Sequence, residues 1–300
     1  MTMSNTTKAT LAGLTGYGIW GFSFLFSKVA LDAATPFSLL SIRFILAFLA
    51  LNVILLTGKV RFSLKGKPVG RLLLLGLVQP VIYFICETYG IDLTSTSFSG
   101  IIIGMSPVVG LIFGVLFLKE SCTAFRAFCT VMSVVGAVLT TTGGLGNVSL
   151  PGFLFLLGAL VSAATFVVLS RSIAPLFTPF ERTYVMFALG SVSFTAIAFV
   201  QNLDDPGAWT APMATPGFWG SVLYLAVISS VCAFMLINYA VNYLSAGTTM
   251  IFSNFSTVIS VLSGIFIMHD KFVPLQLVGI IIITLSVFGV SYQKEAPAKQ

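Results

Sequence analysis

The sequence consists almost entirely of apolar runs of about 20 residues that alternate with short polar gaps. An α-helix needs roughly 20 apolar residues to cross the hydrocarbon core of a bilayer. Ten such runs fall at residues 9–31, 36–57, 71–91, 95–118, 124–143, 151–170, 182–200, 217–242, 246–268 and 272–292. The gaps leave no room for a soluble domain. The sequence therefore predicts an all-α integral membrane protein with ten transmembrane helices.

The composition excludes a soluble protein of this length. Hydrophobic residues make up 57% of the 300 residues, and charged residues make up 8%. Soluble domains carry about 25% charged residues, because these residues form the surface that faces water. The first run is too long for the apolar core of a signal peptide, contains Trp20 and Lys28, and precedes nine more runs, so we interpret it as a membrane span.

The distribution of basic residues predicts the orientation in the membrane. There are 15 basic and 9 acidic residues. With a cytoplasmic N-terminus, Lys271 alone lies outside, and Lys28 and Arg43 lie within spans. The other basic residues lie on the cytoplasmic side: Lys8, Lys59, Arg61, Lys65, Lys67, Arg71, Lys119, Arg126, Arg171, Arg182, Lys294 and Lys299. This bias predicts a bacterial-type inner membrane protein with both termini cytoplasmic. Because the basic residues lie in short loops, membrane lipids and not nucleic acid are the expected partners.

Cysteine and histidine give no sign of a metal centre. The four cysteines, Cys86, Cys122, Cys129 and Cys232, form no C-x-x-C pair, and His269 is the single histidine. A phosphate-binding G-x-x-x-x-G-K-[ST] motif is also absent from the sequence. We therefore expect no cofactor and no direct use of ATP by this chain.

The two halves of the sequence match each other at fixed offsets. At an offset of 143, Lys28 corresponds to Arg171 and Pro36 to Pro179. At an offset of 150, Phe84 corresponds to Phe234, and Glu120 corresponds to Asp270, so an acidic residue closes the fourth span of each half. We predict repeats at residues 1–146 and 147–300. Five spans is an odd number, so the repeats cross the membrane in opposite senses, as in many secondary transporters.

The fourth run carries a family resemblance. Residues 95–120, with Ser106-Pro107 in mid-span and Lys119-Glu120 at the end, resemble the signature of the drug/metabolite transporter superfamily, EamA type. In the second half, Thr257 stands at the position of the proline and Asp270 at that of Glu120. The resemblance covers nearly the whole chain. It implies export of amino acids or other small metabolites, as by the YddG-like exporters.

Small residues in spans four and nine predict close helix packing. Span four contains Gly110 and Gly114 at a spacing of four, and span nine contains Ser260 and Gly264 in the same register. Small residues at this spacing allow two helix backbones to approach. We expect these two spans to be tightly packed structural helices.

Two prolines interrupt spans three and four, at Pro80 and Pro107. Each removes a backbone donor and frees a carbonyl within the membrane. We consider two roles for each proline, a hinge that exposes a carbonyl to a ligand or a simple structural kink.

A polar stripe lies on span three, where Gln79, Tyr83 and Glu87 follow at intervals of four. A carboxylate within a span usually faces a cavity or the bundle interior. Glu87 either binds a substrate ammonium group, carries a coupled proton, or forms a structural ion pair with Lys28 or Arg43.

Further candidate binding residues lie on other spans. They are Trp20 on span one, Asn238, Tyr239 and Asn242 on span eight, and Asn254 on span nine. The amides suit a carboxylate or hydroxyl group, although amides also join helices to each other. Trp20, in mid-span, either lines a cavity that accepts aromatic groups or faces lipid.

Together these features predict a secondary transporter of small metabolites, in which the two halves rock around a cavity formed mainly by spans 1, 3, 4, 6, 8 and 9. The alternative is an intramembrane enzyme that acts on lipids or peptides. Such an enzyme needs acid–base partners close together, whereas His269 lies at the end of span nine and no G-x-S-x-G motif occurs. We therefore predict a transporter.

Overall fold

The structure, a computed structural model, describes residues 4–94, 96–140, 149–269 and 273–292. Within these ranges every regular element is helical. In chain order they are α1 (Asn5–Leu31), α2 (Pro36–Leu56), α3 (Val69–Gly76), η1 (Leu77–Ile82), α4 (Tyr83–Asp92), α5 (Thr96–Gly104), α6 (Ser106–Leu118), α7 (Ala124–Thr140), α8 (Leu150–Ile173), α9 (Pro179–Gln201), α10 (Pro206–Thr210), η2 (Ala211–Ala214), α11 (Pro216–Leu223), η3 (Tyr224–Cys232), α12 (Ala233–Tyr243), α13 (Ala246–Ile251), α14 (Ser253–Ile267) and α15 (Pro274–Ser291).

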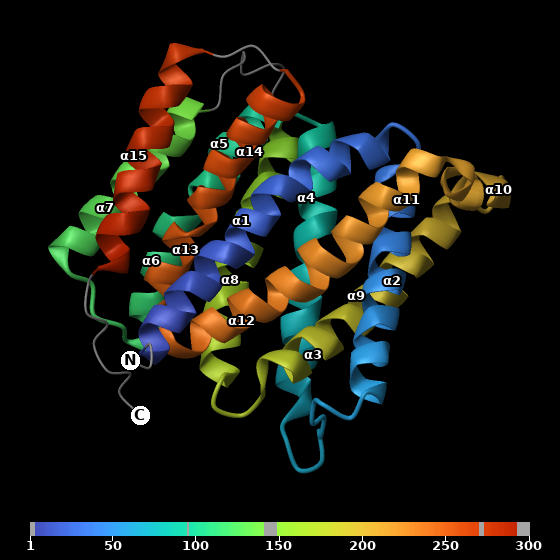
Figure 1. Cartoon of the computed structure of the whole chain (residues 1–300), viewed down its shortest axis with the longest axis horizontal. Coiled ribbons are helices and arrows are strands. Elements are labelled where there is room, and N and C mark those ends of the chain that lie inside the picture. The colour runs from blue at the N-terminus through green and yellow to red at the C-terminus, as the bar shows by residue number, and fades with distance from the viewer. Residues whose placement is uncertain (1–3, 95, 141–148, 270–272, 293–300) are drawn as a thin grey trace.

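These elements make ten spans in one bundle (Figure 1). Spans 1 and 2 are α1 and α2. Span 3 is α3–η1–α4, span 4 is α5–α6, and spans 5, 6 and 7 are α7, α8 and α9. Span 8 is α11–η3–α12, span 9 is α13–α14, and span 10 is α15. Within the described ranges, nine are long and apolar enough to cross a membrane, and α7 is a shorter apolar helix of 17 residues. The ten-helix fold predicted from the sequence is confirmed.

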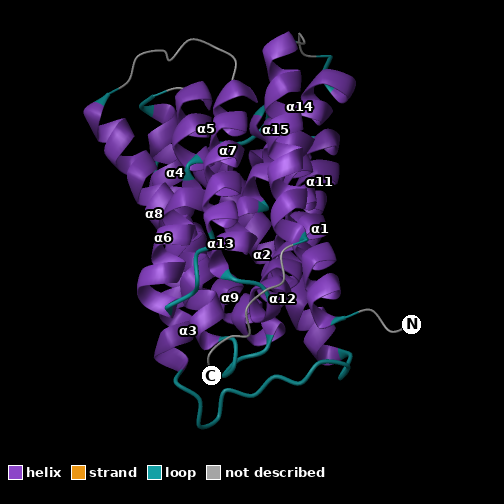
Figure 2. Ribbon diagram, turned by 90° about the vertical axis from the view of Figure 1, so that its left-hand side faces the viewer, coloured by secondary structure: helices purple, strands orange, loops and turns teal. Residues whose placement is uncertain are grey.

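The start of α1 and the end of α15 lie at the same end of the bundle (Figure 1). We call this the terminal end, and the other the opposite end. The loop between α2 and α3 also lies at the terminal end (Figures 1 and 2), and the segment with α10 and η2 lies at the opposite end. The predicted repeat boundary between residues 146 and 147 lies outside the described residues, as does Asp270.

Local sequence signals start spans 2 and 7 in the same way. Thr35 accepts a hydrogen bond from the Ser38 backbone N–H, and Pro36 occupies the first turn of α2. Thr178 likewise accepts from the Glu181 backbone N–H, with Pro179 in the first turn of α9. A threonine cap satisfies a free N–H, and a proline in the first turn has no N–H to lose. The two starts are 143 residues apart, the offset seen in the sequence.

The helix packing pairs the two halves. Span 1 packs on span 8 as span 3 packs on span 6, and span 1 packs on span 9 as span 4 packs on span 6. The halves also meet directly. The hydroxyl oxygens of Ser106 on span 4 and Ser253 on span 9 lie 3.3 Å apart. A Cβ at Gly136 would lie 2.8 Å from the Gly279 carbonyl, so spans 5 and 10 touch through their backbones. The paired contacts fit two inverted five-helix repeats.

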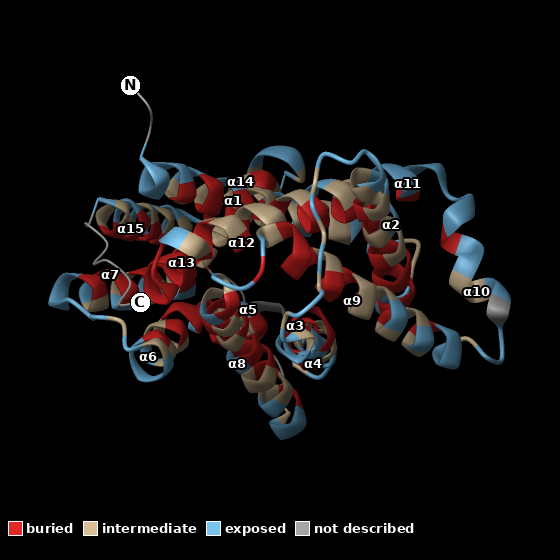
Figure 3. Cartoon of the chain, turned by 90° about the horizontal axis from the view of Figure 1, so that it is seen from below, coloured by how far each residue is buried: buried red, intermediate tan, exposed pale blue. Residues whose placement is uncertain are grey.

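The outer surface of the bundle is apolar, as a lipid-facing surface must be. Large hydrophobic side chains are exposed on several spans, among them Leu56, Phe117, Val192, Phe266 and Leu285. Figure 3, which looks along the bundle from the terminal end, shows buried residues between the helices and exposed residues around them.

The prediction that the small residues of spans 4 and 9 serve helix packing is confirmed for Gly110 and Gly114 and wrong for Ser260 and Gly264. Gly110 and Gly114 do face span 9, but they contact Met250 and Ala246 of α13, not the face that carries Ser260. Ser260 and Gly264 instead line a cavity. The reason is that span 9 is broken at Phe252 between α13 and α14, so residues on either side of the break face different neighbours.

Candidate functional site

A cavity of about 560 Å³ lies inside the bundle. Its wall includes Phe166 and Phe234 near the middle of spans 6 and 8. It also includes Ile91, Thr140 and Gln276, which lie near the helix ends farthest from the chain termini. The cavity therefore extends from mid-bundle to the opposite end. Its volume falls in the range of roughly 300–1,000 Å³ that is typical of small-molecule sites.

The polar stripe of span 3 forms one wall of this cavity. Gln79, Tyr83 and Glu87 all line it, and the Tyr83 hydroxyl donates to Glu87 Oε1 at 2.8 Å. Gln79 leaves the helical conformation (φ −144°, ψ 122°) at the break before Pro80. Its side chain is 4% exposed, and its Oε1 has no hydrogen-bond partner among the described residues. A buried amide oxygen without a partner is costly, so a donor on a ligand would stabilise it.

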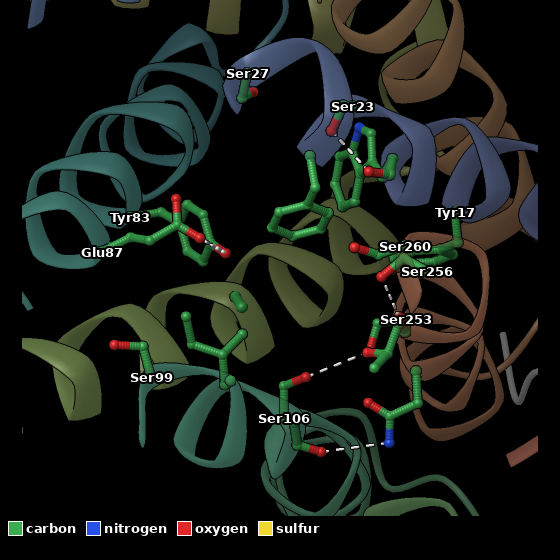
Figure 4. Close-up of a pocket in the computed structure, with 18 of the residues that line it drawn as sticks. Tyr17, Ser23, Ser27, Tyr83, Glu87, Ser99, Ser106, Ser253, Ser256 and Ser260 are labelled. Carbon is green, nitrogen blue, oxygen red and sulfur yellow. Dashed lines mark hydrogen bonds between the residues drawn. The ribbon is translucent and has the colours of Figure 1, made fainter. Parts of the chain in front are cut away.

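The facing wall carries a row of serines on α14. Ser253, Ser256 and Ser260 follow at intervals of three and four and line the cavity opposite Tyr83 and Glu87 (Figure 4). Ser253 donates to the Met250 carbonyl and Ser256 to the Ser253 carbonyl, both at 2.6 Å. The protons of Ser253 and Ser256 are thus engaged within the helix, and the oxygens of these two hydroxyls remain as acceptors.

Trp20 lines the cavity together with other aromatic side chains. Its ring meets Tyr17 and Phe234 edge-on, with centroids 5.3 and 4.9 Å apart. Its indole N–H donates to the Ser229 carbonyl at 3.0 Å. Ser229 lies in η3, where the wider helix turn alters the usual carbonyl partners. Of the two predicted roles for Trp20, the structure therefore has it in the wall of a cavity with aromatic neighbours.

Asn254 also lines the cavity, next to the break in span 4. It is 2% exposed and donates to the Gly104 carbonyl and to Ser133 Oγ, each at 3.3 Å. Gly104 ends α5, so Asn254 satisfies a carbonyl that the break leaves free.

The two prolines lie at the breaks in spans 3 and 4. The Gln79–Pro80 peptide bond is cis, and Pro80 lies within η1. Pro107 lies in the first turn of α6, after Met105 separates α5 from α6. Both spans are therefore interrupted beside the cavity.

The three candidates on span 8 lie outside the cavity wall. Asn238 is fully buried, accepts from Ser170 Oγ at 2.6 Å and donates to Thr183 Oγ1 at 3.0 Å. Asn242 accepts from Arg182 Nη2 at 2.5 Å. Tyr239 packs against Tyr243. The structure thus separates these residues from Gln79, Tyr83, Glu87 and Asn254.

Arg182 is the centre of that separate polar group. It is fully buried and donates from Nη1 to the Ser170 carbonyl and hydroxyl, at 2.7 and 2.8 Å. Its Nη2 donates to the Asn238 carbonyl at 2.6 Å as well as to Asn242. Arg182 therefore joins the ends of spans 6, 7 and 8.

An ion pair continues this polar group at the terminal end. Arg171 Nε lies 2.5 Å from Glu120 Oε1. Glu120 also accepts from the Ala246 backbone N–H at 2.9 and 3.0 Å, and Arg171 Nη1 donates to the Val241 and Leu244 carbonyls. We call Glu120, Ser170, Arg171, Arg182, Asn238 and Asn242 the polar seal. It connects spans 4, 6, 7, 8 and 9 on the side of the cavity that faces the terminal end.

Sequence reasoning missed several cavity residues. Arg43 was considered only as an ion-pair partner, but it lines the cavity, and no nitrogen of Arg43 or Lys28 lies within 4.0 Å of a Glu87 oxygen among the described residues. The serines of α14 were also missed. Their spacing in the sequence, which puts them on one helix face, was a signal that could have found them.

Comparison with known proteins identifies the family. The model of the EamA-like transporter family matches residues 7–142 and, a second time, residues 150–292. The chain belongs to the EamA-like transporter family. This EamA-like chain is therefore a multi-pass membrane transporter, and the two matches agree with two repeats.

Individual relatives of this EamA-like transporter include one that is named as a transporter. The chain is 32% identical to the uncharacterized transporter YcxC of Bacillus subtilis, over 100% of this chain and 98% of the relative. It is 23% identical to the WAT1-related protein At1g44800 of Arabidopsis thaliana, over 75% and 68% of the two chains. These names lend no support to the enzyme alternative. A solved crystal structure shares the fold with a TM-score of 0.81 at 18% identity, over 94% of this chain and 96% of that one.

Proposed function

We propose that this transporter moves small zwitterionic metabolites, amino acids including aromatic ones, out of the cell. Transport occurs by alternating access, as the two five-helix halves rock around the central cavity. The observation that carries the proposal is the cluster of Gln79, Tyr83 and Glu87 in the cavity wall, where an unpartnered amide oxygen lies on the same helix face as a carboxylate.

The chemistry of the wall supports an amine-bearing substrate. An ammonium group has three donors and needs acceptors when it leaves water. Glu87, Gln79 Oε1 and the serine oxygens of α14 are acceptors on two facing walls. Asn254 lines the same cavity, and Trp20 supplies an aromatic surface for an apolar side chain.

The broken spans support movement around the cavity. Pro80 and Pro107 mark interruptions in spans 3 and 4, and equivalent irregular segments occur in η3 of span 8 and at Phe252 of span 9. We propose that Pro80 and Pro107 are hinges. In the present state the cavity reaches the opposite end while the polar seal closes the terminal end, which is one of the two states that alternating access requires.

The orientation belongs to the same proposal. With both termini in the cytoplasm of a bacterial-type inner membrane, the state described here faces outward. Single cysteines at Asp205 and Lys65 test this by labelling of intact cells with a membrane-impermeant reagent. We expect labelling at Asp205→Cys and protection at Lys65→Cys, and the reverse pattern contradicts the assigned orientation.

Uptake into liposomes tests the substrate and the site together. The purified transporter is reconstituted and assayed against a panel of radiolabelled amino acids, with Gln79→Ala and Tyr83→Ala as variants. We expect both variants to lower uptake at least several-fold while they fold and reconstitute normally. Wild-type rates in both variants would remove the span 3 wall from the substrate site.

Glu87 has a second role to be tested in the same assay, the transport of a coupled proton. An imposed pH gradient should then drive uptake by the wild type and not by Glu87→Gln. If Glu87 serves only to bind the ammonium group, Glu87→Gln weakens uptake equally with and without the gradient.

A further inference from the structure

Arg43 is a buried cation in the cavity wall that forms no direct ion pair with a described carboxylate. Its side chain lies on α2 and is 7% exposed. Nε donates to Ser230 Oγ at 2.8 Å and Nη2 to Ser229 Oγ at 3.3 Å. The guanidinium carbon lies 5.5 Å from the centroid of the Phe84 ring. All these partners are neutral, and no carboxylate oxygen of the described residues lies within 4.0 Å.

The two arginines of the polar seal show how this protein satisfies a structural guanidinium. Arg171 is paired with Glu120, and Arg182 donates four hydrogen bonds to oxygens at helix ends. Arg43 has five N–H donors, of which the described residues engage two. A buried charge with few partners is costly unless something else binds it. Arg43 differs from the other two because it borders a cavity that can hold a ligand.

The chemistry of a guanidinium selects the ligand. Its planar fork of donors matches a carboxylate, which it can bind through two parallel hydrogen bonds. Glu87 lines the same cavity at more than 4.0 Å from Arg43, so the two opposite charges border one cavity without a direct ion pair. A zwitterion, whose ammonium and carboxylate groups are adjacent, can satisfy both charges at once.

We propose that Arg43 binds the carboxylate of the substrate, while Glu87, Tyr83 and Gln79 bind its ammonium group. This inference rests on the proposed function and replaces the amides of span 8 as the carboxylate partners. Ser229 and Ser230 of η3 hold Arg43 in place and are positioning residues. Arg43 thereby distinguishes amino acids from amines that lack a carboxylate.

Ligand binding to the full-length purified transporter tests the assignment. Three probes share one aromatic side chain: phenylalanine, phenethylamine, which lacks the carboxylate, and 3-phenylpropionate, which lacks the ammonium group. Dissociation constants are measured in detergent by titration calorimetry, so passive leakage of the amine through a membrane has no effect. The variants are Arg43→Gln, Arg43→Lys and Glu87→Gln. The matched control is Lys28→Gln, which removes an exposed cation outside the cavity wall.

We expect Arg43→Gln to raise the dissociation constant of phenylalanine about tenfold or more. The dissociation constant of phenethylamine should stay within about threefold of the wild-type value. Arg43→Lys keeps the charge and should retain part of the affinity, which shows that the loss is not a folding defect. Glu87→Gln should raise the dissociation constant of phenethylamine and leave that of 3-phenylpropionate unchanged. Lys28→Gln should change none of the three constants.

The failures of the two proposals are distinguishable. If the wild type binds 3-phenylpropionate but no amino acid, the proposed function is wrong, and loss of that binding in Arg43→Gln still supports Arg43 as the carboxylate partner. The inference is overturned if Arg43→Gln binds the carboxylate-bearing probes as tightly as the wild type does. It is also overturned if Arg43→Gln loses as much affinity for phenethylamine as for phenylalanine. Wild-type binding of no carboxylate-bearing probe overturns it as well.

Discussion

The two ends of the helix bundle differ in what their polar residues do. At the terminal end, the polar seal joins five spans through hydrogen bonds and an ion pair, and its groups bond to one another. Toward the opposite end, the polar residues border the cavity, and one of them, Gln79, has an amide oxygen without a hydrogen-bond partner among the described residues. In an inverted-repeat protein these ends are built from equivalent segments, so the difference indicates which end is closed in this state.

Burial alone therefore does not mark a binding residue in this protein. Asn238 and Asn254 are both amides, and both are almost completely buried. Asn238 is bonded to side chains of neighbouring helices within the seal, while Asn254 lies in the cavity wall. Substitutions in the seal should therefore change stability, and substitutions in the cavity wall should change ligand binding.

The largest effect should come from breaking the ion pair of the seal. Glu120→Ala leaves Arg171 without its counter-ion, and both side chains are more than four-fifths buried. Removing one partner of a buried pair costs about 3 kcal/mol or more. We expect a clear fall in the melting temperature of the purified transporter. The double variant Glu120→Ala/Arg171→Ala should lose less than the sum of the single variants, and strict additivity would show that the pair does not couple the spans.

The next largest effect should distinguish the structural role of Asn238 from the binding role of Asn254. Asn238→Ala removes the hydrogen bonds with Ser170 and Thr183 and should lower the free energy of unfolding by about 1–3 kcal/mol. The affinity of the folded protein for substrate should be unchanged. Asn254→Ala, the matched variant in the cavity wall, should lower that affinity. A loss of affinity in Asn238→Ala equal to that in Asn254→Ala would bring span 8 back into the site.

Sequence reasoning found the ten spans, because an apolar run of about 20 residues is sufficient to identify each one. It also found the stripe of Gln79, Tyr83 and Glu87, since a spacing of four defines one helix face. It did not separate Asn238 from Asn254, because residue type and spacing say nothing of which way a helix is rotated in the bundle. The wide turns in η1 and η3 and the break at Phe252 change that rotation within a span.

A serine of the cavity wall should give a smaller effect on stability. Ser256→Ala removes an oxygen that faces the cavity and whose proton bonds only to its own helix. We expect the free energy of unfolding to change by no more than about 0.5 kcal/mol, while uptake of amino acids falls measurably. Unchanged uptake would remove this part of α14 from the substrate site.

The smallest effect on stability should come from the partly exposed ion pair between Lys67 and Glu181 at the terminal end. Lys67 pairs with Glu181 at 2.7 Å, but the lysine side chain is 30% exposed. Glu181 also accepts from the backbone N–H groups of Ser63 and Thr178. Lys67→Ala should therefore cost about 1 kcal/mol or less, measured by thermal unfolding. A loss as large as that of Glu120→Ala would mean that the loop between α2 and α3 belongs to the seal.

Labelling of a single cysteine in the cavity wall tests most directly whether the cavity binds substrate and opens at the opposite end. Ser260→Cys is made in a variant without the four native cysteines and exposed to an impermeant maleimide from each side of sealed vesicles. Lys65→Cys and Asp205→Cys mark the two sides. We predict that Ser260→Cys reacts from the side of Asp205 and that a saturating amino acid substrate slows the reaction. Reaction only from the side of Lys65, or a rate that no amino acid changes, would contradict the account.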